Sequence, residues 1–192
     1  MSPPWMLVRL ALDTSIHQHQ ADEDRLSAID LRSNPGYRAF LHKVYGFEAA
    51  VEAAIARSGV ESMFTHGRYK ADLLRSDLAA LGATEDPIRA EVSIRSPAHA
   101  MGWLFVLERH TLLSGLIRRH IQRTLGDVPV GYLSAYNERP GIRFRAFGDA
   151  LGVCAQRHTP RAIIAGANEA FRAQRSWYEA GPRPSLSEAF AQ

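Results

Sequence analysis

Apolar residues recur at the three- and four-residue spacing of amphipathic helices through most of this chain. The repeats predict helices at about 5–20, 34–58, 68–81, 97–125 and 142–156, and a last helix from 160 onward. Three of these helices begin with a capping residue followed by proline: Asn34-Pro35, Ser96-Pro97 and Thr159-Pro160. The short stretch 90–94 is the one candidate strand. The pattern therefore predicts an all-α bundle of about six main helices.

The length of the chain sets the expected domain organisation. With 192 residues it is long enough to bury one sizeable core, and we expect a single helical domain over residues 1–192. We expect its core at about 5–180, and a loose C-terminal tail after Gly181.

The composition, together with the absence of a recognisable targeting signal, predicts a cytoplasmic protein. The N-terminal stretch has no basic segment before a long apolar one, and no small-residue cleavage site. No segment reaches about 18 uninterrupted apolar residues, so we expect no contact with a membrane. The only cysteine, Cys154, has no internal disulfide partner, so a reducing compartment is allowed.

The basic residues are almost all arginines. Lys43 and Lys70 are the only lysines among 23 basic residues, and the net charge is +3. The arginines are scattered along the sequence rather than clustered, so we expect no nucleic-acid partner. Arginine favours planar anions that accept two hydrogen bonds, carboxylates among them.

The stretch 101–123 is apolar on more than one side, which predicts a helix in the centre of the bundle. Glu108, Arg109 and His110 interrupt it, and Ser114-Gly115 follows one turn later. Buried charge and imidazole are costly without partners, and Gly115 weakens a helix by roughly 1 kcal/mol relative to alanine. These breaks mark either a functional site or a polar surface strip with a close helix contact at Gly115.

Two histidines, His17 and His19, lie beside apolar residues on the first predicted helix. A histidine in such a place is usually a hydrogen-bonded core or interface residue. Neutral imidazole is also a common ligand of metals and haem, so ligation stays open for both. The sequence contains no HExxH, CxxC, Walker loop or GxSxG motif that would point to other chemistry.

Several local patterns resemble the haem oxygenase family, in particular its bacterial biliverdin-producing branch. The resemblance covers roughly 9–178, and its parts are Ser27-Ala28-Ile29-Asp30-Leu31, Asn34-Pro35-Gly36-Tyr37, Arg75, Asp77-Leu78, Leu81-Gly82, Gly102 to Glu108 and Phe144-Arg145-Ala146-Phe147. The order and spacing of these parts carry the likeness. It implies a haem-oxygenase-like helical bundle.

The resemblance also implies which residues bind haem. The spacing to Tyr37 favours His19 as the proximal ligand of the haem iron, with His17 as the second choice. Ser15, four residues before His19, matches the threonine usual in the family. Arg145 takes the position of a basic residue that pairs with a haem propionate.

The distal helix departs from the family pattern. After the glutamate the family reads Gly-Ser-x-Leu-Gly-Gly, or a variant with aspartate second, whereas Glu108 is followed here by Arg109-His110-Thr111-Leu112-Leu113-Ser114-Gly115. The family's glycines let the helix bend and bring its backbone against the haem. Arg109, Leu113 and Ser114 replace three of them. A shifted alignment recovers a glycine at Gly115 but places Leu116 at the next one.

His110 takes the place of a small polar or acidic residue that serves the distal water network in the family. It could fill that catalytic role, ligate the iron from the distal side, or fill the cavity. The sequence leaves all three open.

Two functions follow as expectations. The first is an oxidoreductase, a haem oxygenase that cleaves haem to biliverdin, CO and iron with O2 and with electrons from a donor such as a ferredoxin or reductase. Haem is then both cofactor and substrate. The second is a non-catalytic haem or tetrapyrrole binder, or a helical partner protein, because the distal glycines are replaced. A different reaction on the same scaffold is a third alternative.

Overall fold

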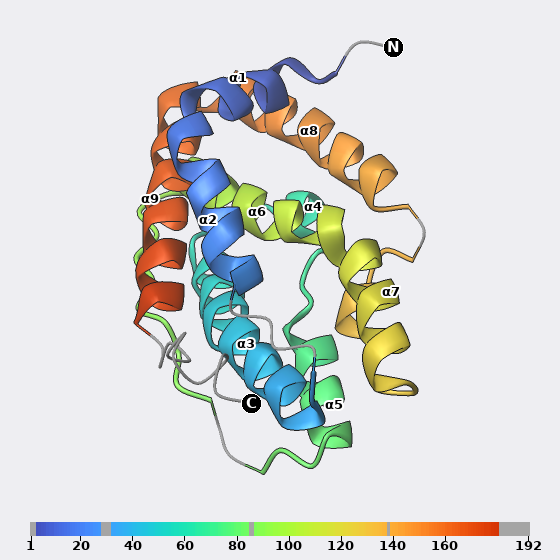
Figure 1. Ribbon diagram of the computed structural model, residues 1–192. Helices are drawn as coiled ribbons and strands as arrows, with labels where there is room; N and C mark the ends of the chain where they lie inside the picture. The colour runs from blue at the N-terminus through green and yellow to red at the C-terminus, as the bar shows by residue number, and fades with distance from the viewer. Residues whose placement is uncertain (1–2, 28–31, 85–86, 138, 181–192) are drawn as a thin grey trace.

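The computed structural model describes residues 3–27, 32–84, 87–137 and 139–180 (Figure 1). Its elements in chain order are α1 (Trp5–Asp13), α2 (Ser15–Ser27), α3 (Asn34–Arg57), α4 (Ser62–Thr65), α5 (Ala71–Ala80), α6 (Pro97–His110), η1 (Thr111–Leu113), α7 (Ser114–Leu125), η2 (Tyr132–Ser134), α8 (Pro140–Arg157) and α9 (Pro160–Glu179). The predicted all-α class is confirmed, and 90–94 forms no strand. The expected loose tail, 181–192, lies outside the described residues.

The predicted first helix is two helices, α1 and α2, which are separated at Thr14. The backbone of Thr14 leaves the helical conformation, with φ at −118° and ψ at 6°. Its hydroxyl donates to the carbonyl oxygen of Leu10 at 2.7 Å, and the Ser15 hydroxyl donates to that of Leu12 at 3.0 Å. Short hydroxyl side chains compete in this way with backbone hydrogen bonds, which explains the break.

The second of these helices also runs further than predicted, to Ser27. The added residues include acidic ones that are paired with cations of other helices. Asp22 lies 2.5 Å from Arg109, and Asp24 lies 3.2 Å from Arg175. These pairs hold the acidic stretch against the bundle as helix.

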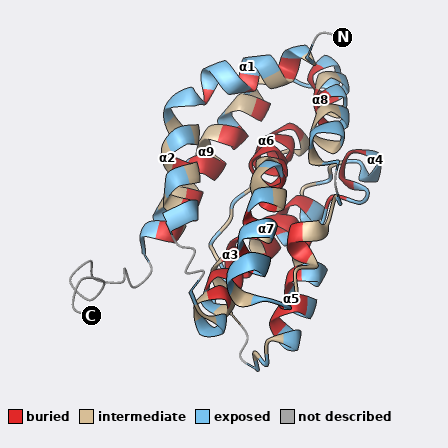
Figure 2. Ribbon diagram, turned by 45° about the vertical axis from the view of Figure 1, so that its right-hand side comes forward, coloured by how far each residue is buried: buried red, intermediate tan, exposed pale blue. Residues whose placement is uncertain are grey.

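The predicted central helix at 97–125 is present, but it is bent. The Ser96 hydroxyl accepts a hydrogen bond from the His99 N–H at 3.2 Å, and Pro97 is the first helical residue. A 3-10 turn, Thr111–Leu113, then separates α6 from α7, which leaves at an angle (Figure 1). Figure 2 shows that α6 is buried along almost its whole length.

Glycines let α6 and α9 cross with their backbones in contact. A Cβ at Gly102 would collide with the backbone of Ile163 and Ala167, and one at Gly166 with the carbonyl oxygen of His99. Small residues at a crossing set how closely two helix axes can approach. By contrast, a Cβ at Gly115 would meet only an Arg119 nitrogen at 3.6 Å, so Gly115 makes no close helix contact.

Two apolar clusters make up the core, and α3 contributes to both. One surrounds α6 and includes Phe47 and Trp103; the other lies between α3, α5 and α7 and includes Tyr37 and Ile117. Cys154 of α8 is buried in the first cluster, and this burial raises the pKa of its thiol. No helix in the described part of the chain is long and apolar enough to cross a membrane.

Replacing Gly166 by alanine should destabilise the fold, because the new methyl group has no space between α6 and α9. We expect Gly166→Ala to lower the free energy of unfolding by about 3 kcal/mol in urea denaturation. The control Gly115→Ala should leave stability unchanged or raise it by up to about 1 kcal/mol. Equal stabilities of the two variants would contradict the close crossing.

Candidate functional site

Polar side chains gather in the centre of the bundle, around the C-terminal end of α6. They include three cations and three glutamates, and we call them the polar cluster: Arg25, Glu48, Glu52, Arg68, Lys70, Glu108, His110, Tyr132, Tyr136 and Gln174. All are buried except Tyr136, which is half-buried. Cations and carboxylates lie next to one another in it, which is a condition for burying either kind of group.

Glu108 is fully buried on α6 and is held from two sides. The Arg68 guanidinium donates to Oε2 at 2.9 Å, and the Tyr136 hydroxyl donates to Oε1 at 2.5 Å. The Lys70 ammonium lies 4.0 Å from Oε1. The prediction that this buried charge has partners is therefore confirmed.

His110, two residues later, has both ring nitrogens facing oxygen atoms. Nδ1 lies 2.8 Å from Oε1 of Glu48, and Nε2 lies 2.9 Å from Oε1 of Gln174. The Gln174 amide nitrogen donates to the carbonyl oxygen of Ala21 at 2.8 Å, which fixes the orientation of that amide. Burial lowers the pKa of His110, and Arg25 adds to this, while Glu48 and Gln174 oppose the shift. Neither ring nitrogen is left over for a ligand.

Glu48 of α3 is the centre of this network. Besides His110, its Oε1 accepts a hydrogen bond from the Tyr132 hydroxyl, and Arg25 in turn donates to that hydroxyl at 3.2 Å. Burial by itself would raise the pKa of Glu48, but the hydrogen bond from His110 and the charges of Lys70 and Arg25 lower it overall. Glu48 is therefore ionised and joins α2, α3, α6 and η2.

Lys70 and Glu52 lie in the part of the polar cluster beside the start of α5. The two carboxylate oxygens of Glu52 accept hydrogen bonds from the backbone N–H groups of Lys70 and Ala71, at 2.6 and 3.1 Å. These bonds fix the start of α5. Burial raises the pKa of Glu52 to about 7, although the nearby Lys70 charge acts in the opposite direction.

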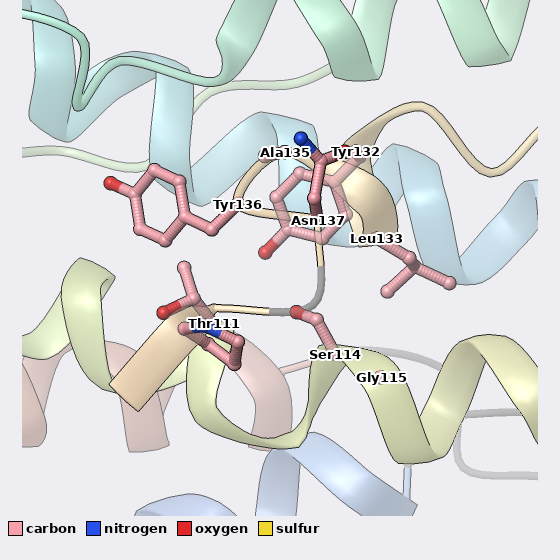
Figure 3. Close-up of a pocket in the computed structure, with 9 residues that line it drawn as sticks. Thr111, Ser114, Gly115, Tyr132, Leu133, Ala135, Tyr136 and Asn137 are labelled. Atoms are coloured by element: carbon pink, nitrogen blue, oxygen red, sulfur yellow. The ribbon is translucent and has the colours of Figure 1, made fainter. Parts of the chain in front are cut away.

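The bend between α6 and α7 borders a small cavity (Figure 3). Its volume is about 10 Å³, close to the smallest that holds one water molecule. Ser114 is buried here and donates to the carbonyl oxygen of His110 at 3.3 Å. Gly115 also lines the cavity, opposite Tyr132 and Asn137.

Arg109 connects the C-terminal end of α6 to α2. Its guanidinium donates to Asp22 at 2.5 Å, and its Cζ lies 6.0 Å from the centre of the Phe171 ring. Leu112 in the 3-10 turn and Leu116 on α7 are 39% and 60% exposed. Leu113 instead packs against the apolar cluster of α3, α5 and α7.

The candidate proximal residues lie on α2. The His19 side chain is 86% exposed, and its Nε2 lies 3.0 Å from Oε1 of Glu23, one turn later. His17 is half-buried. Arg145 lies on α8 and is half-buried. Of the candidates, Arg109, His110, Ser114 and Gly115 are neighbours along the bend.

Most residues of the polar cluster were not predicted from the sequence. Glu48 and Glu52 lie one helical turn apart on a face of α3 that is otherwise apolar. That spacing was a usable signal, because paired carboxylates on a core face need buried cations. Tyr132 and Gln174 gave no comparable signal, since nothing in their local sequence indicates that they are buried.

Comparisons with known proteins define the fold. No protein-family model matches the chain, and no curated protein sequence matches it. A solved structure is similar, that of the NO- and CO-bound heme oxygenase from Neisseria meningitidis. The TM-score is 0.70 and the identity 24%, with 92% of this chain and 94% of that chain covered. The chain therefore has a haem-oxygenase-like fold, as the sequence resemblance predicted.

The buried Glu52 makes a testable contribution to the pH dependence of stability. Its carboxyl has an ordinary pKa of 4.5 and a pKa of about 7 in the folded chain. Between those values the folded state holds a proton that the unfolded state has lost, so stability falls as pH rises. We expect a loss of up to about 3 kcal/mol between roughly pH 5 and pH 8, measured by urea denaturation.

Two variants separate the contribution of Glu52 to the pH dependence of stability from other contributions. Glu52→Gln should remove that part of the pH dependence. Glu61→Gln, which changes an exposed carboxylate paired with Arg157, should retain it. The same pH dependence in wild type and Glu52→Gln would rule out Glu52 as its source.

Proposed function

We propose that this chain binds haem, or a closely related tetrapyrrole, between α2 and the bent segment formed by α6, η1 and α7. The observation that carries the proposal is the likeness of the fold to a haem oxygenase over 92% of the chain. The bend at Thr111–Leu113 and the two histidines of α2 support it, because α2 and this segment face each other across the Arg109–Asp22 pair.

The α2 histidines fit a haem iron. His19 is exposed enough for iron to reach its imidazole without displacing any core residue. Its contact with Glu23 leaves Nδ1 for the metal, and a carboxylate partner orients a ligating imidazole and makes it more basic. His17, half-buried two residues earlier, remains the second choice.

The bent segment of α6, η1 and α7 has groups that can bind the carboxylates and the apolar ring of a haem. Nε of Arg109 is buried and has no hydrogen-bond partner among the described residues, while an Nη donates to Asp22. A haem carboxylate could therefore replace Asp22 as acceptor through a charge-assisted hydrogen bond. Leu112 and Leu116 provide apolar surface, and Arg145 is the second proposed carboxylate partner.

A haemin titration tests the proposal. We expect a Soret band typical of histidine ligation, and we expect His19→Ala to weaken haemin binding by about tenfold or more, since an iron ligand is lost. His17→Ala should have a smaller effect, and His158→Ala, which changes an exposed histidine after α8, should have none. Wild-type spectra for both α2 variants would exclude the proposed ligands, and no haemin binding would exclude the function.

The proposal extends to cleavage of the bound haem. Haem, when bound, supplies the iron at which O2 reacts and the ring that is cleaved, while a separate protein supplies electrons. His110 can turn a ring nitrogen toward a ligand only by giving up Glu48 or Gln174. Arg109 fills space where the resembling family has glycine. We therefore propose that the chain cleaves haem slowly, with His110 as a polar group of the distal side.

A non-catalytic haem carrier is the second candidate. The enclosure of both His110 ring nitrogens by Glu48 and Gln174 favours it, because a distal network needs a donor that is free to move. A carrier would use the same α2 histidine and the same arginines. It would release haem intact.

Single-turnover assays distinguish the two candidates. With haemin bound and a reductant in air, we expect slow formation of biliverdin by the wild type. Arg109→Gly should speed it by about tenfold, because it opens the distal side. Arg172→Gly on the exposed face of α9 is the control and should not change the rate. Rapid wild-type conversion would contradict slow turnover, and no biliverdin from any variant would identify a carrier.

A further inference from the structure

Helix α1 contains more apolar residues than its packing in the bundle uses. Seven of its nine residues are apolar, and Arg9 and Asp13 are the charged ones. Met6 and Leu10 are fully buried in the apolar cluster around α6. These two residues place one face of α1 against the bundle.

The opposite face of α1 is also apolar, but it is exposed. Trp5, Val8 and Leu12 are separated by three and four residues, which is the spacing of one helix face. They are 52%, 41% and 68% exposed, and we call them the α1 stripe. Figure 2 shows exposed residues along α1 at one end of the bundle. A helix that is apolar on two opposite faces is normally covered on both.

The exposed apolar surface continues from the α1 stripe onto α8. The indole nitrogen of Trp5 lies 3.5 Å from the position that a Cβ of Gly152 would take, and the next residue, Val153, is exposed. Single exposed apolar side chains are common on protein surfaces, but adjoining ones mark a site of protein or membrane contact. The α1 stripe and Val153 therefore indicate a surface that another molecule covers.

The charges beside the α1 stripe fit a second copy of the same helix. Arg9 and Asp13 are both exposed on one flank of the stripe, and the Arg9 Nε donates to the Asp13 carboxylate at 2.5 Å. When two α1 helices lie antiparallel across a two-fold axis, this flank meets its own copy in reverse order. Arg9 of each copy then faces Asp13 of the other, so the surface is complementary to itself.

A membrane surface fits the α1 stripe less well. Helices that lie on membranes carry several basic residues beside their apolar face, and these attract anionic lipids. Arg9 is the only cation of α1, and its pair with Asp13 offsets its charge. The charge beside the stripe is therefore balanced and gives no attraction to anionic lipid.

We propose that the α1 stripe binds a second copy of this chain, with the two α1 helices antiparallel across a two-fold axis. The apolar stripes form the centre of the contact, and the Arg9 and Asp13 side chains form its polar rim, an arrangement common in homodimers. The inference rests on the surface of α1 and holds whether or not the chain binds haem.

Analytical ultracentrifugation over a range of protein concentrations tests the proposal. We expect the wild type to form a reversible dimer. Leu12→Asp should weaken dimer formation by about tenfold or more, because it puts a carboxylate in the apolar centre of the contact. The control Ile142→Asp makes the same kind of change at an exposed residue near the start of α8 and should change the dimer affinity by less than about twofold. Circular dichroism checks that both variants are folded.

Charge reversal tests the antiparallel arrangement. Arg9→Asp leaves only carboxylates on the flank and Asp13→Arg leaves only guanidinium groups, so each variant alone should dimerise about tenfold more weakly at low salt. An equimolar mixture of the two should associate about as tightly as the wild type, since opposite charges then face each other. Arg157→Asp and Glu61→Arg, which reverse the charges of another exposed pair, should dimerise like the wild type, alone and mixed.

Three outcomes would overturn the proposal. One is a wild type that stays monomeric up to about 0.5 mM, a concentration at which even a weak specific dimer forms. Another is a Leu12→Asp dimer as tight as that of the wild type, or a mixture of the two charge variants that associates no better than each alone. The third is a wild-type monomer that binds phosphatidylcholine vesicles through Leu12, which would identify the stripe as a membrane surface.

Discussion

The structure depends on the placement of ionisable groups in a helix that is buried on almost every side. Glu108 and His110 cannot reach water, so other segments must supply their partners. Arg68, Glu48 and Gln174 do so from three different parts of the chain. Removing one partner of a buried charge pair costs about 3–5 kcal/mol, more than most apolar contacts contribute. Charge pairing therefore fixes the positions of these segments together with apolar packing.

Much of the fold follows from local sequence. The helices that start at Pro97 and Pro160 begin where a capping residue and proline predict. The third, α3, begins one residue earlier than predicted, because the hydroxyl of Ser33 rather than Asn34 caps it by accepting from the Gly36 N–H. The errors arise where side chains act over distance or against the backbone. Thr14 breaks a helix through its own hydroxyl, and α2 continues because its acidic residues find cations on other helices. Periodicity contains no information on such partners.

The site was less predictable than the fold. The sequence correctly indicated that Glu108 and His110 need partners, but it did not identify them, because Glu48 is 62 residues from His110 along the chain. It also suggested Gly115 as the close helix contact, whereas Gly102 and Gly166 fill that role. The sequence showed Arg109, Leu113 and Ser114 at positions where the resembling family has glycine. Only the structure shows that Arg109 donates to Asp22 of α2, and that Leu113 packs against the apolar cluster of α3, α5 and α7.

The spread of the polar cluster along the chain has a consequence for folding cooperativity. Its hydrogen bonds join residues separated by as many as 153 positions, from Ala21 to Gln174. A partly folded state that formed one apolar cluster first would hold α3 carboxylates in the core before all their partners had arrived. Such a state pays for charges that are buried and unpaired. Both halves of the core should therefore assemble and come apart in one all-or-none transition, without a populated intermediate.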